Sequence, residues 1–331
     1  MEYRELGRTG LRVPEIGFGC GNVGGMMVRG SHEAQISAVQ HALALGIDYF
    51  DTAAMYGDGL SETHLGEVLA ELKPDVRVAT KAAVRREDLG DIAGAVRRSL
   101  EASLTRLQLD SVDLLQLHTN LANGPDTERF IDKADVLRTG GVADVFDALK
   151  GEGLIRHMGI TGMGDTDALH EVIESGRFET VQCYHNVLNP SAGVKVGPGF
   201  VGQDYRELMA KAGAQGMGVI VIRVVAGGAL GGPVARQGLA SKTPGEVTGS
   251  GIDYDDELRR TEAISFLTEG GATPVQASIR LALDNPATSV VLVGYSDEGQ
   301  IDEAVAAADL PSITPDQRTR LAGLWDSDFR V

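Results

Sequence analysis

The sequence predicts an α/β protein, a closed (β/α)8 barrel (TIM barrel) preceded by a β-hairpin. Eight short apolar runs are spaced along the 331 residues, and segments with apolar residues at three- and four-residue spacing lie between them. The runs are continuously apolar rather than alternating, as expected for parallel strands covered on both faces. Eight strand–helix units in a chain of this length favour a barrel over its competitor, a doubly wound sheet with a second domain.

The elements are predicted in order along the chain. The hairpin is expected in the stretch "YRELGRTGLRVPEIG", where two short β segments flank Gly7-Arg8-Thr9-Gly10. The predicted strands follow as residues 15–20, 48–53, 76–82, 112–118, 156–162, 180–186, 218–225 and 289–295. Predicted helices between them include residues 33–46, 62–72, 93–109, 142–153, 166–176 and 205–216. No proline- or serine-rich linker interrupts the series, so residues 1–331 are expected to form a single barrel domain.

Three long segments follow predicted strands: residues 119–141, 186–203 and 225–251, of which the last two are rich in glycine. In a barrel, the loops that follow strands lie at the C-terminal face, where active sites are found. We expect the two glycine-rich segments to shape the substrate pocket. The substrate itself, and the oligomeric state, then depend on conformations that no local pattern specifies.

Composition restricts the partners. The formal net charge of −17 repels nucleic acid and anionic membranes, so a small molecule is the expected partner. A cofactor that carries phosphate would need a local cationic pocket. Cys20 and Cys183 lie far apart and form no Cys-x-x-Cys pair, which is typical of small buried residues in a reducing cytosol. No apolar leader and no run long enough to span a bilayer is seen, so a cytoplasmic protein is expected.

Polar residues mark the ends of three neighbouring predicted strands. Asp51, Lys81 and His118 stand at the C-terminal ends of the second, third and fourth strands, and Tyr56 follows Asp51 in "DTAAMYGDG". Polar side chains in such strands are costly unless they are satisfied. In a barrel these four converge at one mouth, which predicts an acid, a phenol, an amine and an imidazole in one partly dry pocket.

The chemistry of this set follows from its residue types. A phenol is a poor acid at neutral pH, because its ordinary pKa is about 10. A nearby lysine ammonium favours the phenolate, and Asp51 could keep Lys81 charged by pairing with it. Tyr56 could then donate a proton to a carbonyl oxygen or accept one from an alcohol, while His118 orients the substrate oxygen. No metal-ligand cluster and no Ser-His-Asp pattern on a nucleophile elbow competes with this interpretation.

These residues carry a resemblance to a known family. "DTAAMYG", Lys81 in "VATKAA" and His118 in "DLLQLHTN" resemble the Asp-Tyr-Lys-His tetrad of the aldo-keto reductase superfamily, and the likeness runs from "YRELGRTGLRVPEIGFG" to "SVVLVGYSDEGQIDEAVAA". The resemblance implies a (β/α)8 barrel that moves a hydride between a nicotinamide cofactor and a carbonyl or alcohol carbon. It implies that Tyr56 is the general acid/base, that Lys81 and Asp51 tune it, and that His118 orients the substrate.

The resemblance also implies cofactor contacts on later strands. In the family, a Ser-Asn pair at the end of strand five and a Gln in strand six hold the nicotinamide carboxamide. Here these positions are Thr161, Gly162 and Gln182, so one side-chain contact is lost or replaced by backbone. In strand seven, Ile222 and Arg223 stand where the family has a stacking aromatic and a serine. Arg223 could supply a cation for the pyrophosphate, or it could pair with a neighbouring carboxylate.

The loop after the last strand favours one cofactor over the other. Gly294, Ser296 and Gln300 are predicted cofactor contacts there, and family members that use NADP carry a basic residue in this loop. This chain has Asp297 and Glu298 instead, which would repel a 2′-phosphate. The expected cofactor is NAD(H) or NADP(H), with NAD favoured. "GITG" and "SVVLVG" are similar to the branch that oxidises sugars at the anomeric carbon, the L-galactose and L-fucose dehydrogenases.

The predicted function is therefore that of an NAD(P)-dependent oxidoreductase acting on a small polar aldehyde, ketone or sugar lactol. Two alternatives remain open. One is an NADPH-dependent reductase of xenobiotic carbonyls. The other is a catalytically weak protein that senses the cofactor, as the potassium-channel β subunits of the superfamily do, since such a protein can retain the tetrad.

The segment "GCGNVGG" also fits the dinucleotide fingerprint G-x-G-x-x-G, with Asp51 as the acid that would bind the ribose. A Rossmann unit starts its helix directly at these glycines, so that the helix N-terminus meets the phosphates. Here "GGMMVRGSHE" intervenes, and the first helix is expected to begin near Ser31. We therefore predict that the glycines end a barrel strand and bring backbone close to the pocket floor.

Overall fold

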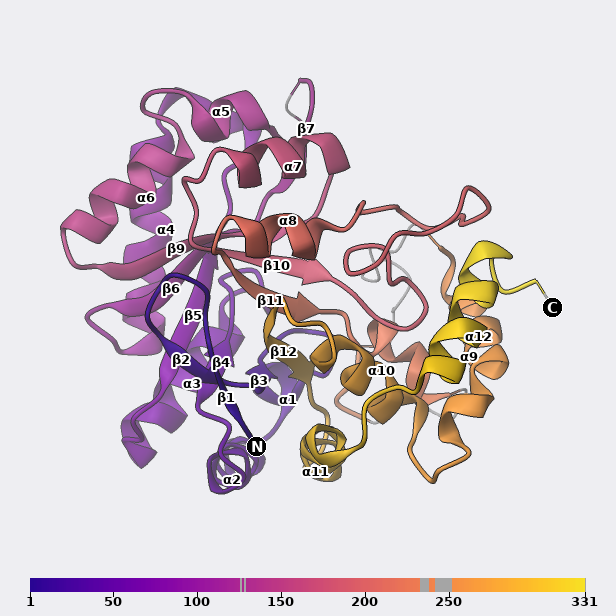
Figure 1. Cartoon of the computed structure of the whole chain (residues 1–331). Coiled ribbons are helices and arrows are strands. Elements are labelled where there is room, and N and C mark those ends of the chain that lie inside the picture. Colours follow the sequence, from indigo (N-terminus) through magenta and orange to yellow (C-terminus); the bar gives the residue numbers. More distant parts are fainter. Residues whose placement is uncertain (126, 128, 233–237, 242–251, 331) are drawn as a thin grey trace.

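Eight parallel strands close into a barrel, as predicted, with an antiparallel hairpin at the N-terminus (Figure 1). The computed structural model describes residues 1–125, 127, 129–232, 238–241 and 252–330. Around the barrel each strand pairs with the next, and β12 pairs with β3 to close the ring. The barrel strands are β3 (Ile16–Gly19), β4 (Tyr49–Asp51), β5 (Arg77–Ala82), β6 (Val112–Leu117), β9 (Ile155–Gly162), β10 (Thr180–Tyr184), β11 (Gly218–Ile222) and β12 (Thr288–Gly294).

Helices surround the barrel, and the six predicted ones are confirmed. In α4, apolar residues at four-residue spacing, Ile92, Val96, Leu100 and Leu104, are buried, and the Asp91 carboxylate accepts the Gly94 N–H at 2.9 Å to cap the helix. The helices that cover the strands are α2 (His32–Ala44), α3 (Leu60–Leu72), α4 (Ile92–Leu107), α6 (Val142–Gly151), α7 (Thr166–Glu174), α8 (Leu208–Ala214), α10 (Pro274–Leu283) and α11 (Gly299–Ala306).

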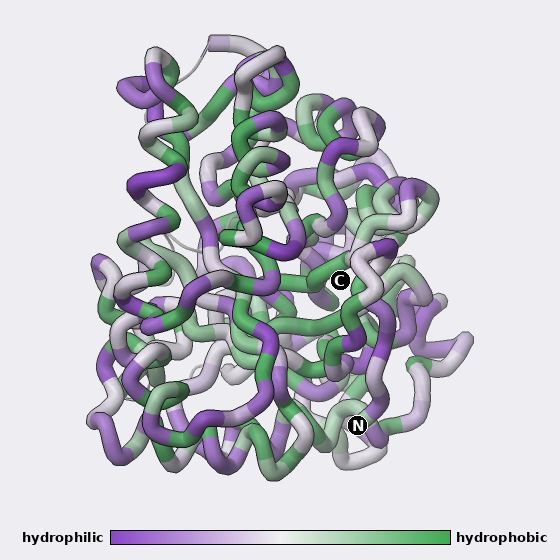
Figure 2. The backbone as a smooth tube through the Cα atoms, turned by 90° about the vertical axis from the view of Figure 1, so that its left-hand side faces the viewer, coloured by the Kyte–Doolittle hydropathy of each residue, from purple (hydrophilic) through white to green (hydrophobic). Residues whose placement is uncertain are grey.

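The core has an outer and an inner part. The larger cluster lies between strands and helices, and hydrophobic segments run through the interior of the molecule in Figure 2. The inner cluster fills the barrel with Tyr49, Ala79, Leu114, Ile220, Val290 and Leu292. This is the packing expected of parallel strands with both faces covered, and it leaves polar side chains to the C-terminal end of the barrel.

The hairpin of β1 (Tyr3–Glu5) and β2 (Arg12–Pro14) closes the N-terminal end of the barrel. Leu6 and Val13 are fully buried and belong to the cluster inside the barrel. The hairpin turn fits closely against β11: Gly7 has a φ of +54°, and a Cβ there would lie 2.1 Å from the backbone nitrogen of Gly218. A glycine is therefore required at this point, on both conformational and steric grounds.

Two segments contain structure that the sequence analysis did not predict. Residues 119–141, expected to be a loop, contain the parallel pair β7 (Asn120–Ala122) and β8 (Phe130–Asp132) and the helix α5 (Lys133–Leu137). Leu121, Ile131 and Val136 are buried, so this excursion adds to the core. A one-turn helix, α1 (Met26–Arg29), precedes α2, which begins directly after its N-cap Ser31, close to the predicted start.

The C-terminal elements form a second apolar cluster at one side of the barrel mouth. Helices α9 (Tyr254–Ala263) and α12 (Pro315–Asp326) lie together there, at the right of Figure 1, with the 3-10 helix η2 (Ala226–Gly231). The Trp325 indole N–H donates to the Val187 carbonyl at 2.9 Å, which anchors α12 to the loop after β10. Most of the predicted loop 225–251 lies outside the described residues. Across the described ranges, no helix has the length and apolar character needed to cross a bilayer.

Candidate active site

A buried ion pair stands at the C-terminal ends of β4 and β5. Asp51 ends β4 and Lys81 lies near the end of β5, and their side chains are almost completely buried. The Lys81 ammonium donates to an oxygen of Asp51, to the Thr52 carbonyl at 2.8 Å and to the Tyr56 hydroxyl at 3.2 Å. An ammonium has three protons, so this network uses all of them and fixes the direction of each.

The Lys81 ammonium stays charged despite its burial. Burial opposes the charge, but the Asp51 carboxylate and Tyr56 favour it, and the net result is a pKa raised above the ordinary value for lysine. A permanent cation therefore lies next to the Tyr56 oxygen and 4.8 Å from the centre of its ring.

Tyr56 is held by a sharp turn after β4. Gly57, Asp58 and Gly59 all have positive φ angles, of 62°, 54° and 90°. The backbone N–H of Tyr56 donates to Ala53, and its carbonyl accepts from Ser61 at the start of α3. A Cβ on Gly21 would lie 3.6 Å from the Tyr56 ring, so the glycine-rich loop after β3 passes directly beside the phenol.

His118 follows β6 and faces the same group. Its backbone N–H donates to Ala82 at the end of β5, and its ring meets the Tyr56 ring edge-on at 90°, with 5.6 Å between centroids. Burial lowers the pKa of His118 to about 3, and the charges of Lys81 and Arg223 add to the shift. The imidazole is therefore neutral at physiological pH. Its buried Nδ1 has no hydrogen-bond partner within the described part of the chain.

Two glutamine amides complete the shell of Asp51. The side-chain nitrogens of Gln116 and Gln182 donate to Asp51 Oδ2 at 2.9 and 2.8 Å. Gln182 was predicted from the family resemblance as a contact to the nicotinamide carboxamide, so its bond to Asp51 was not foreseen, and Gln116 was missed altogether. Its signal was present: a polar residue in a strand of leucines, two positions before His118 and thus on the same face of the strand.

The residues predicted to hold the nicotinamide carboxamide lie on adjacent strands. Thr161 of β9 is the register partner of Gln182 of β10, and the buried Thr161 hydroxyl has no hydrogen-bond partner among the described residues. A Cβ on Gly162 would lie 2.3 Å from the Gln182 carbonyl oxygen, so the two strands approach too closely there for a side chain. The absence of a side chain at Gly162 thus has a steric cause, and the loss of a carboxamide contact or its replacement by backbone stays a prediction.

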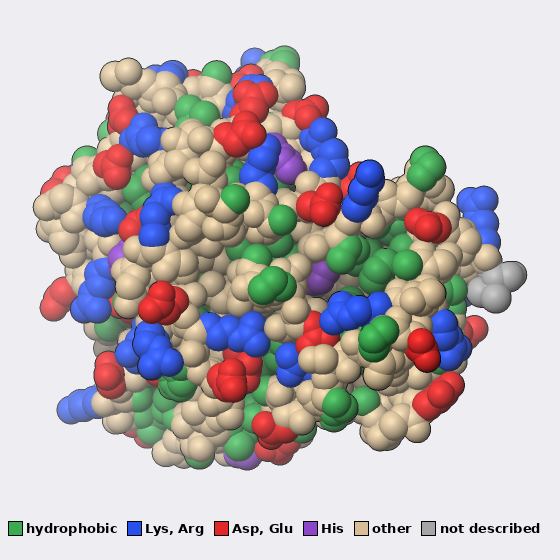
Figure 3. All heavy atoms as spheres, viewed as in Figure 1, with side chains coloured by type: hydrophobic (Ala, Val, Ile, Leu, Met, Phe, Trp, Pro, Cys, Tyr) green, Lys and Arg blue, Asp and Glu red, His purple; other side chains and the backbone are tan. Residues whose placement is uncertain are grey.

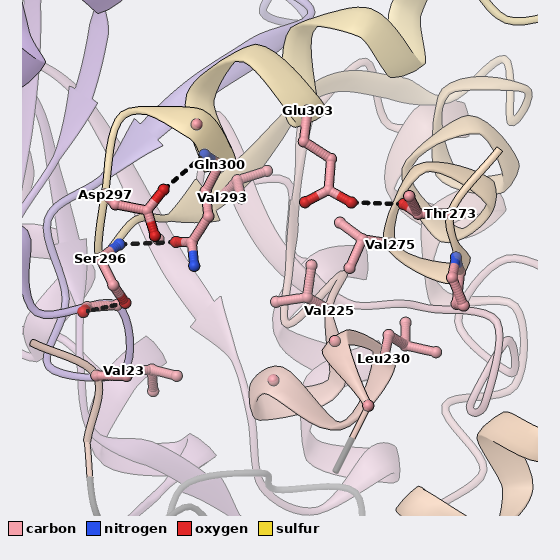
Figure 4. Close-up of a pocket in the computed structure, with 18 residues that line it drawn as sticks. Val23, Val225, Leu230, Thr273, Val275, Val293, Ser296, Asp297, Gln300 and Glu303 are labelled. Atoms are coloured by element: carbon pink, nitrogen blue, oxygen red, sulfur yellow. Dashed lines mark hydrogen bonds between the residues drawn. The ribbon is translucent and has the colours of Figure 1, made fainter. Parts of the chain in front are cut away.

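A cavity of about 620 Å³ lies beyond β12, at the C-terminal face (Figure 4). Three predicted cofactor contacts, Gly294, Ser296 and Gln300, line it. The Ser296 N–H donates to the Gln300 side-chain oxygen at 2.8 Å, and the Ser296 hydroxyl donates to the Gly24 carbonyl at 2.8 Å. These bonds tie the start of α11 to the glycine-rich loop and shape one wall of the cavity.

The described wall of the cavity contains acidic side chains but no basic ones. Of the two acids predicted to repel a 2′-phosphate, Asp297 lines the cavity and Glu298 does not, whereas Glu303, which was not predicted, does. Neither lysine nor arginine occurs among the described residues of the wall. Glu303 accepts a hydrogen bond from the Thr273 hydroxyl at 2.6 Å, whereas Asp297 accepts from the Gln300 N–H at 3.1 Å. Figure 4 shows Asp297 beside Gln300 at one side of the cavity and Glu303 facing Thr273 at the other.

Arg223 lies apart from this cavity. It follows β11 with a φ of +59°, and its carbonyl accepts from the Asn186 side chain at 2.9 Å. Burial lowers the pKa of Arg223, and its charge acts on His118. The structure thus brings Arg223 toward the tetrad rather than into the cavity lined by Gly294, Ser296 and Gln300, so its predicted role at the pyrophosphate stays a prediction.

The residues present fit the nicotinamide end of a dinucleotide cofactor, whereas the cation expected for its phosphates is not found in the described wall of the cavity. The orphaned hydroxyl of Thr161 and the amide of Gln182 could hold a carboxamide, while the cavity has the size of a cofactor site and offers backbone from three glycine-containing loops.

The glycines of "GCGNVGG" bring two loops together. A Cβ on Gly24 would lie 2.4 Å from the Tyr295 backbone nitrogen, so only glycine allows the loop after β3 to touch the loop after β12. A helix does begin at Met26, contrary to the expectation that the first one starts near Ser31. It has only four residues, and the Met26 N–H already donates to the Tyr295 carbonyl at 3.0 Å. Its N-terminus therefore does not act as a Rossmann phosphate site.

Comparisons with known proteins agree with the fold and show the family. The model of the Aldo/keto reductase family matches residues 15–326. L-galactose dehydrogenase of Arabidopsis thaliana is 31% identical over 329 residues, which cover 96% of this chain and 92% of the plant enzyme. The holo form of an aldo-keto reductase from Bacillus halodurans superposes with a TM-score of 0.73 at 23% identity, covering 99% of this chain and 97% of that one. An aldo-keto reductase from Klebsiella pneumoniae in complex with NADPH has a TM-score of 0.68 at 18% identity, covering 98% and 95%.

Proposed function

This chain belongs to the aldo-keto reductase family, and from that premise we propose that it transfers a hydride between a nicotinamide cofactor and the carbonyl or alcohol carbon of a small polar substrate. The observation that supports this most directly is the Lys81 ammonium, which contacts both Asp51 and the Tyr56 hydroxyl in a buried pocket. A phenol beside a fixed cation suits proton transfer to and from a substrate oxygen.

The proposed mechanism assigns one task to each side chain. A bound nicotinamide supplies or accepts the hydride. Tyr56 donates its proton to the carbonyl oxygen during reduction and takes the proton from the alcohol during oxidation. Lys81, held by Asp51, stabilises the phenolate that Tyr56 becomes or starts from. His118 is neutral and hydrogen-bonds the substrate oxygen, which fixes the reacting carbon relative to Tyr56.

The proposed substrate is a sugar lactol or a related small polar aldehyde or ketone. The similarity to the plant L-galactose dehydrogenase extends over 96% of this chain and supports oxidation at an anomeric carbon. Such a substrate presents a hydroxyl on the carbon that loses the hydride, as the Tyr56 mechanism requires.

The proposed cofactor preference is for NAD over NADP. Asp297 and Glu303 line the cavity at the start of α11, and a 2′-phosphate there would meet carboxylates. Titration with both cofactors by calorimetry should give tighter binding of NAD. The substitution Asp297→Arg should strengthen NADP binding about tenfold or more, because it exchanges a repulsion for a charged hydrogen bond.

The control for this experiment is Asp309→Arg, an equal change of charge at an exposed position outside the cavity. It should leave the ratio of the two dissociation constants unchanged. Tighter binding of NADP by the unmodified protein would overturn the preference.

The catalytic role is tested with a panel of sugars and aldehydes, run in both directions with both cofactors. Tyr56→Phe should retain cofactor binding but lose about 10²- to 10⁴-fold in turnover, because general acid–base help contributes that much. Tyr3→Phe removes an exposed hydroxyl far from the site and should leave turnover unchanged. Full activity of Tyr56→Phe would refute the mechanism, and cofactor binding without turnover on the whole panel would favour a cofactor-sensing protein.

A further inference from the structure

We propose that Gln116 is a positioning residue: together with Gln182 it holds the Asp51 carboxylate in the orientation that directs Lys81 onto Tyr56. This inference rests on the proposed role of Tyr56. Gln116 donates to Asp51, Asp51 binds Lys81 and Lys81 donates to Tyr56, so Gln116 acts on the phenol through two intermediate side chains.

The hydrogen bonds around Asp51 leave the carboxylate no freedom to turn. Oδ1 accepts from the Lys81 ammonium, while Oδ2 accepts from Gln116 at 2.9 Å and Gln182 at 2.8 Å. Both amides must present nitrogen, because an ionised carboxylate only accepts hydrogen bonds. Gln116 is fully buried and Gln182 is 2% exposed, so water does not replace either donor.

The barrel topology brings the two amides to Asp51 from different directions. Gln116 is the register partner of Lys81 on the neighbouring strand, whereas β10, which carries Gln182, lies diametrically across the barrel from β4. The strand between β6 and β10 makes room with a glycine: a Cβ on Gly159 would lie 3.3 Å from Gln116 Cγ and 2.1 Å from the Thr180 hydroxyl. The Asp51 carboxylate is therefore held by Gln116 from the same side of the barrel and by Gln182 from the opposite side.

A purely structural role does not account for an amide at this position. The neighbours of Gln116 in β6 are leucines, and an apolar side chain of the same length would fill the space without the cost of burying an amide. The Gln116 side-chain oxygen is itself buried without a partner in the described part of the chain. The hydrogen bond to Asp51 is therefore the interaction that offsets the cost of burying this amide.

Loss of the Gln116 donor should disfavour the phenolate form of Tyr56. The Oδ2 atom would lose one of its two amide donors, so the negative charge of Asp51 would be less dispersed. Asp51 would attract Lys81 more strongly and raise the free energy of a phenolate nearby. Both effects disfavour the phenolate form of Tyr56, so less phenolate is available to take the proton from an alcohol.

Two variants of Gln116 separate positioning from packing. Gln116→Met keeps the length and volume but has no donor, and kcat should fall about tenfold, with KM changed less than about twofold, because a hydrogen bond to a charged group contributes at least this much. Gln116→Glu keeps the shape and restores a donor only when its carboxyl is protonated. Its activity should approach the wild-type value at low pH and fall steeply as pH rises and the new carboxyl loses the proton that it donates to Asp51.

A second measurement needs no substrate. The ionisation of Tyr56 is followed by near-ultraviolet phenolate absorbance, as the difference between each protein and the same protein carrying Tyr56→Phe. The apparent midpoint should rise in the order wild type, Gln116→Met, Gln116→Glu. Failure of the proposed function would appear as no turnover on any panel substrate, whereas this titration would still report the positioning.

Thr180→Val is the matched control. It exchanges a buried polar side chain inside the same barrel for an isosteric apolar one, and the Thr180 hydroxyl has no hydrogen-bond partner among the described residues. It should leave the Tyr56 midpoint and the pH profile unchanged. A Gln116→Met protein with the wild-type midpoint and profile would overturn the proposal, as would a Gln116→Glu protein that shows no recovery at low pH.

Discussion

His118 is a single side chain whose protonation should be visible in the stability of the whole protein. Its pKa is lowered from 6.5 to about 3, chiefly by burial. As pH falls below about 6.5, the unfolded chain binds a proton at this residue, whereas the native protein does not until about pH 3. The free energy of unfolding should therefore decrease as pH falls through this window.

Urea unfolding at pH 7 and pH 5 provides the measurement. The wild-type protein should lose stability on acidification, and His118→Asn should lose less. Some of the loss should remain in the variant, because burial also lowers the pKa of His185, to about 4. An identical loss in both proteins would mean that His118 titrates normally in the native state.

Three members of the tetrad were predictable because each breaks a local pattern, and Tyr56 was found from its position five residues after Asp51. Asp51, Lys81 and His118 are polar at the ends of apolar strands, where only function or a specific partner offsets the cost of burial. Gln116 breaks the same pattern, but an uncharged amide has no acid–base chemistry to draw attention to it. Its partner is also 65 positions away in the chain, so the contact exists only once the barrel closes.

At the scale of elements, the loop after β3 packs directly against the loop after β12 at the C-terminal face. Gly24→Ala would place a methyl group 2.4 to 2.7 Å from the backbone of Gly294 and Tyr295. The loops must separate, which strains the Ser296 hydrogen bond to Gly24 and opens a wall of the cavity. We expect a loss of about 1–3 kcal/mol in stability, together with weaker cofactor binding.

Thermal unfolding and cofactor titration of the Gly24→Ala protein test this expectation. Gly151→Ala, in the last turn of α6, is the control, since a Cβ there meets nothing within 4 Å. The control should be neutral or slightly stabilising, by less than about 1 kcal/mol. Unchanged cofactor affinity in Gly24→Ala would show that the cavity wall does not depend on this contact.

The barrel strands were predictable because burial on both faces selects continuous apolar runs. The positions of their ends were harder to predict. The sixth strand was predicted to run to residue 186, but it ends at Tyr184. The Asn186 side chain accepts hydrogen bonds from the backbone of Leu188 and Asn189, which turns the chain there. Residues 119–141 were missed because β7 and β8 have three residues each, too few for a period to show.

At the scale of the whole molecule, the net charge of −17 should shape cofactor binding. Acidic and basic side chains are interspersed over the face shown in Figure 3, so the excess acts as a diffuse field rather than one patch. The field repels an anionic dinucleotide. Salt at about 0.15 M reduces its range to about 8 Å, so the association rate of NADH should rise between low and physiological ionic strength.

Stopped-flow binding at several salt concentrations measures this rate. A neutral sugar substrate is the internal control, since its KM should not respond to salt. A rate that falls with added salt would instead indicate attraction, and hence a cationic approach path that outweighs the overall charge.

The hairpin covers the N-terminal end of the barrel, so the active site opens to solvent only at the C-terminal end. Leu6, Val13 and Ile220 form an apolar floor in the barrel. On the proposed mechanism, the proton that Tyr56 gains or loses passes through the same mouth that admits the substrate. A bound substrate stands between the phenol and bulk water, so each turnover draws on the proton already present on Tyr56, and exchange with solvent waits until the product has left.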